Sequence, residues 1–167
     1  MKIGVRTINA RAETVAKLPT FRDAFAKRRC LIPADGFFEW RKDGKTKTPY
    51  AIVPKGVPCF AFAGLWEAWR DGAHEGSEWL RTCTIVTGKP NEVAAPIHDR
   101  MPVILEPEAW AKWLGEEPAV ALELLALLRP YPAEKMRAYP ISNRVNSVRN
   151  DDPGLIEPMQ AEGGGWV

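Results

Sequence analysis

The sequence predicts an α+β fold built on a mainly antiparallel sheet, curled and partly barrel-like, with flanking helices. Three observations predict it. The chain has 167 residues, which is enough for one domain with a real core. Its 15 Pro and 13 Gly indicate many turns rather than long helices. Short apolar or alternating runs bounded by Pro and Gly follow one another between residues 30 and 105, as is typical of strands.

Two helices are expected before the strands and two after them. The first follows a junction at 9–14, and the second covers 20–29, where Thr20 is the candidate N-cap and basic residues gather at the carboxyl end. The later helices are expected at 106–114 and 118–128, where Trp and Leu recur at helical spacing and are assigned to the core.

Six strands and a closing segment make up the predicted sheet. The sequence Lys-Asp-Gly-Lys at 42–45 supplies a hairpin turn between the second and third strands. Without a repeat or a linker, the chain reads as one domain over 1–160, followed by a flexible glycine-rich tail at 161–167. The strands are expected at 30–33, 36–41, 49–53, 59–66, 82–87 and 101–105, with a closing strand and loop at 138–147.

The charge is uneven along the chain, although the formal net charge is only +2. Residues 1–60 hold 13 Lys and Arg against 5 Asp and Glu, whereas the remainder is acidic. A basic half suggests an anionic partner such as nucleic acid. An uneven surface without functional meaning is the alternative.

The three cysteines, Cys30, Cys59 and Cys83, lie far apart, with no histidine at metal-ligand spacing. We therefore expect neither a metal site nor a cofactor. Each cysteine lies in an apolar strand context, where a buried and inert thiol is the expected state. The odd count without an apolar leader favours the reducing cytoplasm, and no apolar run approaches the roughly 18 residues that span a bilayer.

The two histidines differ in context. His74 lies in a polar turn and is expected to be solvated. His98 lies in Pro-Ile-His-Asp-Arg-Met-Pro at 96–102, which two prolines stiffen. A histidine held there near charged groups can be a general acid or base. The alternative is a structural histidine hydrogen-bonded to a turn.

Glu39 lies among aromatic residues in a predicted strand, where alternation puts it on one face with Phe37 and Arg41. Desolvation there would raise its pKa and suit it to proton transfer near neutral pH. Pairing with Arg41 or another arginine is the alternative.

Asn9 and Arg11 lie two residues apart at a strand-to-helix junction, so they share a face if the junction is extended. An amide and a guanidinium could then hold a substrate and a phosphate. Asn9 as a cap and Arg11 paired with Glu13 are the alternatives. The sequence has no nucleophile elbow and no phosphate-binding glycine loop.

Four separated segments together resemble the SOS response-associated peptidase (SRAP) family in order and spacing. The segments at 129–132 and 145–147 also look like that family, so the resemblance covers nearly the whole chain. The four segments are Ile-Asn-Ala-Arg-Ala-Glu-Thr at 8–14, Cys-Leu-Ile-Pro-Ala-Asp-Gly-Phe-Phe-Glu-Trp at 30–40, Phe-Ala-Gly-Leu-Trp-Glu at 62–67, and the His98 segment at 96–102.

The resemblance implies a protein that captures abasic sites in single-stranded DNA during the SOS response. An amino-terminal cysteine attacks the ring-opened aldehyde and forms a thiazolidine crosslink; the older name records a thiol autopeptidase activity. By motif, Asn9 would position the reacting amine or sugar, Glu39 would assist ring opening, and His98 would act as acid or base.

The same resemblance implies three DNA-binding residues. Arg11 and Arg100 would hold flanking phosphates, and Thr87 would line the pocket. The implied partner is single-stranded DNA containing abasic sites. We expect a monomer without a membrane partner, located in the cytoplasm and associated with the nucleoid when bound to DNA.

The beginning of the chain departs from the family pattern. Family members begin Met-Cys-Gly-Arg, whereas this chain begins Met-Lys-Ile-Gly just before the Asn9 motif. We therefore expect one SRAP domain over 1–160 that lacks its amino-terminal segment and the cysteine nucleophile. The expected function is abasic-site processing by a lyase or hydrolase. A non-covalent single-stranded-DNA-binding module and an inactive truncated homologue are the alternatives.

Overall fold

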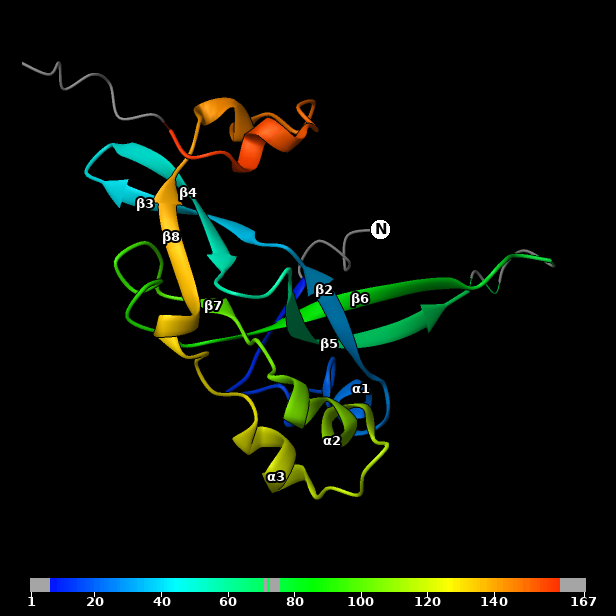
Figure 1. Cartoon of the computed structure of the whole chain (residues 1–167). Coiled ribbons are helices and arrows are strands. Elements are labelled where there is room, and N and C mark those ends of the chain that lie inside the picture. Colours follow the sequence, from blue (N-terminus) through cyan, green and yellow to red (C-terminus); the bar gives the residue numbers. More distant parts are fainter. Residues whose placement is uncertain (1–6, 71, 73–75, 160–167) are drawn as a thin grey trace, which may run out of the picture.

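The computed structural model describes residues 7–70, 72 and 76–159, and in this part of the chain two open sheets pack against each other with helices on one side (Figure 1). The predicted α+β class, rich in strands and poor in helix, is confirmed. The sheet does not close into a barrel, because its strands divide between a five-stranded and a three-stranded sheet. The predicted tail at 161–167 and His74 lie outside the described residues.

The larger sheet has the order β1-β6-β5-β2, with β7 also paired to β6. β1 runs parallel to β6, and the other pairs are antiparallel. β7 pairs with the last residues of β6, beyond the point where β5 ends its pairing. The strands are β1 (Asn9–Arg11), β2 (Arg29–Ala34), β5 (Phe60–Trp69), β6 (Leu80–Gly88) and β7 (Met101–Pro102).

The smaller sheet has the order β3-β4-β8, all antiparallel. Its hairpin closes at Gly44, which has a φ of +61° that favours glycine, so the predicted turn at 42–45 is confirmed. Its strands are β3 (Phe37–Asp43), β4 (Thr46–Pro54) and β8 (Met136–Pro140).

The helices are shorter than the sequence predicts. Residues 12–18 form hydrogen-bonded turns in place of a first helix. Thr20 is not the N-cap of the next helix: Phe21 takes that position, and no side chain caps it. The helices are α1 (Arg22–Lys27), α2 (Trp110–Leu114) and α3 (Ala121–Ala126), and the 3-10 helices are η2 (Pro107–Ala109), η3 (Ala133–Lys135), η4 (Asn143–Asn146) and η5 (Pro153–Ile156).

The first core cluster lies between the larger sheet and the three helices. Trp113 of α2 is fully buried there, packs edge-on against Phe25 of α1 at 6.0 Å, and donates from Nε1 to the Cys30 carbonyl of β2. Arg29 of β2 donates to the Phe25 carbonyl and to the Trp113 carbonyl. These contacts join α1, α2 and the sheet. Trp110 and Leu114, which the sequence assigned to the core, remain more than a third exposed.

The second cluster joins the two sheets. Phe60 and Phe62 of β5 stack at 6.2 Å, and Phe37 of β3 meets Phe62 edge-on at 5.9 Å. A third, smaller cluster covers the outer face of the smaller sheet, where Phe38 and Tyr139 pack against residues of the carboxyl-terminal 3-10 segments. The smaller sheet is therefore covered on both faces.

Trp113→Ala is expected to lower the free energy of unfolding by about 3–5 kcal/mol, because it leaves a cavity where α2 packs and removes the hydrogen bond to β2. Urea denaturation measures the change. Leu122→Ala, at a side chain 77% exposed on α3, is the control and should change stability by less than about 0.5 kcal/mol. Equal losses in both variants would contradict the assigned core.

Candidate functional site

Strand β1 presents two polar side chains on one face. Asn9 and Arg11 are exposed, and Ala10 between them is fully buried in the first core cluster. In the parallel register Asn9 lies beside Ile85 and Arg11 beside Thr87 of β6. Asn9, Arg11 and Thr87 therefore share the face of the larger sheet that turns away from the helices. The predicted extended junction at Asn9 and Arg11 is present.

Glu39 lies on the smaller sheet, on the face that packs against the larger sheet. On β3 it alternates with Phe38, and Phe37 on its own face packs into the cluster between the sheets. Glu39 therefore faces the larger sheet, as strand alternation predicts. It lies nearer the hairpin turn than Phe37, toward the margin of the cluster, where a side chain can be partly buried and still reach solvent.

The loop between β6 and β7 carries His98. Asn91, only 6% exposed, holds this loop: its Oδ1 accepts from the amides of Val93 and Ala94, and its Nδ2 donates to the Tyr131 carbonyl at 2.7 Å. The Ala94 carbonyl in turn accepts from the His98 amide. Asn91 thus positions His98 through the main chain.

The structure brings His98 and Glu39 together from separate elements. The His98 Nδ1 atom lies 3.9 Å from Oε1 of Glu39 and 3.3 Å from Oδ1 of Asp99. The Arg100 amide donates to this Nδ1 at 3.0 Å. Nδ1 also lies 3.2 Å from the Arg100 carbonyl, so it accepts from the amide in one neutral tautomer and can donate to the carbonyl in the other. His98 therefore makes the turn hydrogen bond expected of a structural histidine, and it also lies near the carboxylates of Glu39 and Asp99.

Glu39 is the carboxylate best suited to hold a proton here. Burial raises the pKa of the Glu39 carboxyl above its ordinary value, while His98 and the Trp40 amide act in the opposite direction. Its neighbour Arg41 pairs with Asp43 at 2.9 Å and not with Glu39. The alternative of a Glu39–Arg41 pair is therefore wrong.

Arg100 is engaged by the protein itself. Its guanidinium forms a bidentate salt bridge with the Glu13 carboxylate, with N–O distances of 2.8 and 3.0 Å. It also donates to the Thr87 carbonyl at 2.5 Å. The hydrogen bond from Arg100 lowers the pKa of Glu13 below its ordinary value. Glu13 therefore pairs with Arg100, not with Arg11 as the alternative held. Any phosphate at Arg100 competes with this carboxylate.

The cysteines are less buried than the sequence predicts. Cys59 and Cys83 are exposed, and only Cys30 is partly buried, which raises the pKa of its thiol. Among the described residues, no hydrogen bond or ion pair joins a cysteine to Glu39 or His98. The structure therefore brings no thiol of the described chain to this pair.

Two residues of the site were missed or misassigned by sequence reasoning. Asn91 was not singled out, although an Asn directly before Glu-Val-Ala-Ala is a recognisable cap signal. For Glu13 the sequence indicated only Arg11 as a partner, as an alternative, because the two are close in sequence. Its true partner, Arg100, is 87 residues away, and no local signal indicates that pair.

A cavity of about 400 Å³ lies elsewhere, beside the first half of β6. Its lining is mainly apolar, and Glu67 within it is paired with Arg28. The cavity therefore lacks the convergent polar groups that chemistry needs. In the described part of the chain, no three His, Cys, Asp or Glu side chains gather as metal ligands, and no helix is long and apolar enough to cross a membrane.

The chain is similar to known proteins along most of its length. Residues 1–148 match the family described as SOS response associated peptidase (SRAP). The abasic site processing protein YoqW of Bacillus subtilis (strain 168) is 50% identical over 157 residues, which cover 93% of this chain and 69% of that protein. The abasic site processing protein HMCES of Gallus gallus is 34% identical, with 95% of this chain and 52% of that protein covered.

A solved structure agrees with the fold. The crystal structure of a protein from Bacteroides thetaiotaomicron aligns with a TM-score of 0.87 at 37% identity. The alignment covers 95% of this chain and 68% of that one. The fold of this chain therefore occurs in a solved structure that is 37% identical to it.

Glu39→Gln should stabilise the protein at high pH. Because the folded-state pKa of Glu39 is raised, the cost of ionising it is absent below the unfolded pKa and appears as the pH rises through the folded pKa. The variant lacks this cost. Its melting temperature should exceed the parent's at pH 8, and the gap should close below about pH 4.

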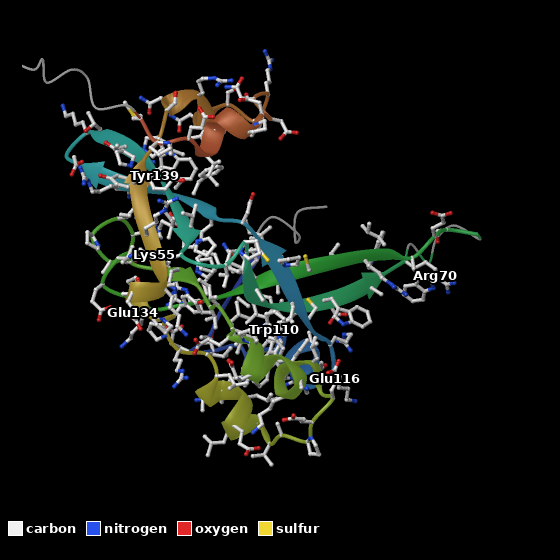
Figure 2. All side chains as sticks on the ribbon, in the orientation of Figure 1. Lys55, Arg70, Trp110, Glu116, Glu134 and Tyr139 are labelled. Atoms are coloured by element: carbon white, nitrogen blue, oxygen red, sulfur yellow. The ribbon has the colours of Figure 1, made fainter. Side chains whose placement is uncertain are left out.

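Thermal unfolding from pH 3.5 to pH 8 measures this difference. Glu116→Gln, at an exposed residue beside α2 (Figure 2), removes an equal charge and should show no such pH-dependent gap. A parent more stable than Glu39→Gln at pH 8 would contradict the desolvation argument.

Proposed function

The chain belongs to the SRAP family, and we propose that it processes abasic sites in single-stranded DNA. The observation that carries the proposal is the approach of Glu39 to His98, 3.9 Å apart, beside the face that bears Asn9 and Arg11. Relatives named abasic site processing proteins support the choice of substrate.

The chemistry proposed for this pair is opening of the abasic sugar. In the closed form, C1′ carries a hydroxyl and a bond to the ring oxygen. Opening breaks the bond from C1′ to the ring oxygen, delivers a proton to that oxygen and removes the hydroxyl proton, which leaves an aldehyde. A carboxyl whose pKa burial raises is suited to donate the first proton. His98 is suited to accept or relay the second.

The remaining site residues would bind and orient the DNA. Asn9 offers an exposed amide for the sugar, and Arg11 an exposed guanidinium for a flanking phosphate. Thr87, which pairs with Arg11 in the sheet, would line the pocket, and Arg100 would bind a phosphate by releasing Glu13.

A crosslinking step would need a nucleophile supplied from outside the described residues, since no described cysteine contacts the Glu39–His98 pair. The family resemblance suggests the amine and thiol of an amino-terminal cysteine. A lyase or self-cleaving peptidase step would need proton transfers of its own, and Glu39 and His98 would be the candidate groups for them. We extend the proposal to a monomer that joins the nucleoid only when bound to DNA.

Non-covalent binding of single-stranded DNA is the second candidate. The basic residues of the first 60 positions and the exposed Arg11 favour it. It differs from the first candidate in requiring no proton-transfer pair. Loss of Glu39 or His98 would then leave the affinity for single-stranded DNA unchanged.

Ring opening can be measured without a crosslink. A single-stranded oligonucleotide with one abasic site is mixed with the chain and an O-alkylhydroxylamine, which traps the free aldehyde. The parent should accelerate trapping over buffer, and Glu39→Gln and His98→Ala should each lose at least about tenfold of that acceleration. Glu116→Gln should retain it.

Affinity is measured in parallel on the same oligonucleotide carrying a tetrahydrofuran in place of the abasic sugar. This analogue cannot open, so binding by Glu39→Gln should remain close to that of the parent. No acceleration by the parent, or full acceleration by Glu39→Gln, would overturn the proposed chemistry and leave the binding candidate.

Glu13→Gln tests the proposed role of Arg100. The variant releases the guanidinium from its internal carboxylate, so binding to the tetrahydrofuran oligonucleotide should tighten. If Arg100 then takes one more phosphate, the slope of log K against log salt should steepen by about 0.7. Fluorescence anisotropy at several salt concentrations gives the slope. An unchanged slope, equal to that of Glu116→Gln, would exclude Arg100 as a phosphate ligand.

A further inference from the structure

The outer half of the β5–β6 hairpin projects beyond the other strands of the larger sheet, and Arg70 lies toward its far end (Figures 1 and 2). Two large aromatic side chains stand exposed on it: Trp69 is 57% exposed and Trp79 is 61% exposed. Such residues on a projecting arm contribute little to the core. An exposed aromatic side chain is informative where it belongs to a contiguous patch rather than standing singly.

The register of the hairpin sorts these residues onto opposite faces. Trp66 pairs with Cys83, and Ala68 with Arg81, so these four share one face. Trp69 pairs with Leu80 on the other face. Arg70 and Trp79 follow that pair directly and fall on the Trp66 side. The Trp–Arg face is defined as Trp66, Ala68, Arg70, Trp79 and Arg81.

The contacts within the Trp–Arg face alternate indoles with guanidinium groups. Arg81 lies over the Trp66 ring at 6.0 Å, and Arg70 lies over the Trp79 ring at 5.0 Å. Trp66, Ala68, Trp79 and Arg81 line an open hollow of about 270 Å³. Each guanidinium thus lies over one face of its ring in cation–π contact, and the hollow remains open beside them.

The Trp–Arg face continues the face of the candidate site. Thr87, Ile85, Cys83 and Arg81 alternate along β6 and so point to the same side, which is also the side of Asn9 and Arg11. From Thr87 to Trp79 the chain covers about 26 Å. A stacked single strand of about eight nucleotides spans that length.

We propose that the Trp–Arg face is a stacking surface for single-stranded DNA that extends the abasic site along β6 toward the hairpin tip. Indoles would stack on bases, and Arg70 and Arg81 would meet the phosphates between them. This inference rests on the proposed function, because the candidate site sets where the strand begins.

The charge of this face favours a nucleic acid over a second protein chain. The charged side chains of the Trp–Arg face are both cations, whereas Glu67 lies on the opposite face and is paired with Arg28. An indole flanked by guanidinium groups matches the flat base and charged phosphate that repeat along a strand.

The hairpin offers its own matched control. Trp79→Ala and Trp69→Ala remove the same side chain at nearly equal exposure, from opposite faces of one hairpin. The probes are single-stranded oligonucleotides with a central tetrahydrofuran: a five-nucleotide strand, and strands extended by ten nucleotides on the 5′ or the 3′ side. Fluorescence anisotropy gives each affinity, and melting curves verify that both variants fold.

One of the two extensions should tighten binding by the parent. Trp79→Ala should lose about tenfold affinity or more for that probe and none for the five-nucleotide probe, while Trp69→Ala should match the parent. Arg70→Gln with Arg81→Gln should flatten the salt dependence for the same extended probe only.

Three outcomes would overturn the inference: no gain from either extension, equal losses in the two tryptophan variants, or a shift in the sedimentation coefficient of free protein caused by Trp79→Ala. The third outcome would assign the face to a second copy of the chain. Aldehyde trapping on the five-nucleotide abasic probe reports the proposed function separately, so its failure can be distinguished from failure of the stacking surface.

Discussion

The register of β6 is the constraint on which the rest of the structure depends. This strand pairs with β1 on one edge and with β5 and then β7 on the other. At Thr87 the carbonyl accepts from the Ala12 amide and from Arg100, so the ends of three segments meet at one residue. A slip of one residue between β1 and β6 would turn the side chains of Asn9 and Arg11 into the core. A slip between β6 and β7 would move Arg100, which directly precedes β7, away from Thr87.

The site depends equally on how the two sheets meet. Phenylalanines from β3 and β5 pack between the facing sides of the two sheets, and Glu39 lies at the edge of this aromatic cluster. There it loses enough water for its pKa to rise, yet it remains within 3.9 Å of His98. Deeper burial would prevent contact with a substrate, and full exposure would remove the shift. The aromatic packing therefore sets the chemistry of the carboxyl.

The sequence predicted correctly those features that depend on local periodicity and turn residues. Strands β2 to β6, the turn at Gly44 and the face that Glu39 shares with Phe37 followed from alternation and turn chemistry. The exposure of Cys83 did not, because β6 runs beyond the core on a projecting hairpin, and no local pattern shows where a core ends. The pairing of Glu13 with Arg100 was equally hidden, because it depends on β1 and β7 flanking the same strand. The roles of Asn9, Glu39 and His98 remain predictions.

Ala10 links the packing of the core to the position of two site residues on β1. Its methyl group is fully enclosed by the first core cluster, and its neighbours on either side are the exposed Asn9 and Arg11. A larger side chain at this position could fit only by lifting β1 from the helices, and both polar groups would move with it. Packing in the core thus restricts which residues β1 can carry at position 10. A small residue there is as necessary to the site as the polar residues that flank it.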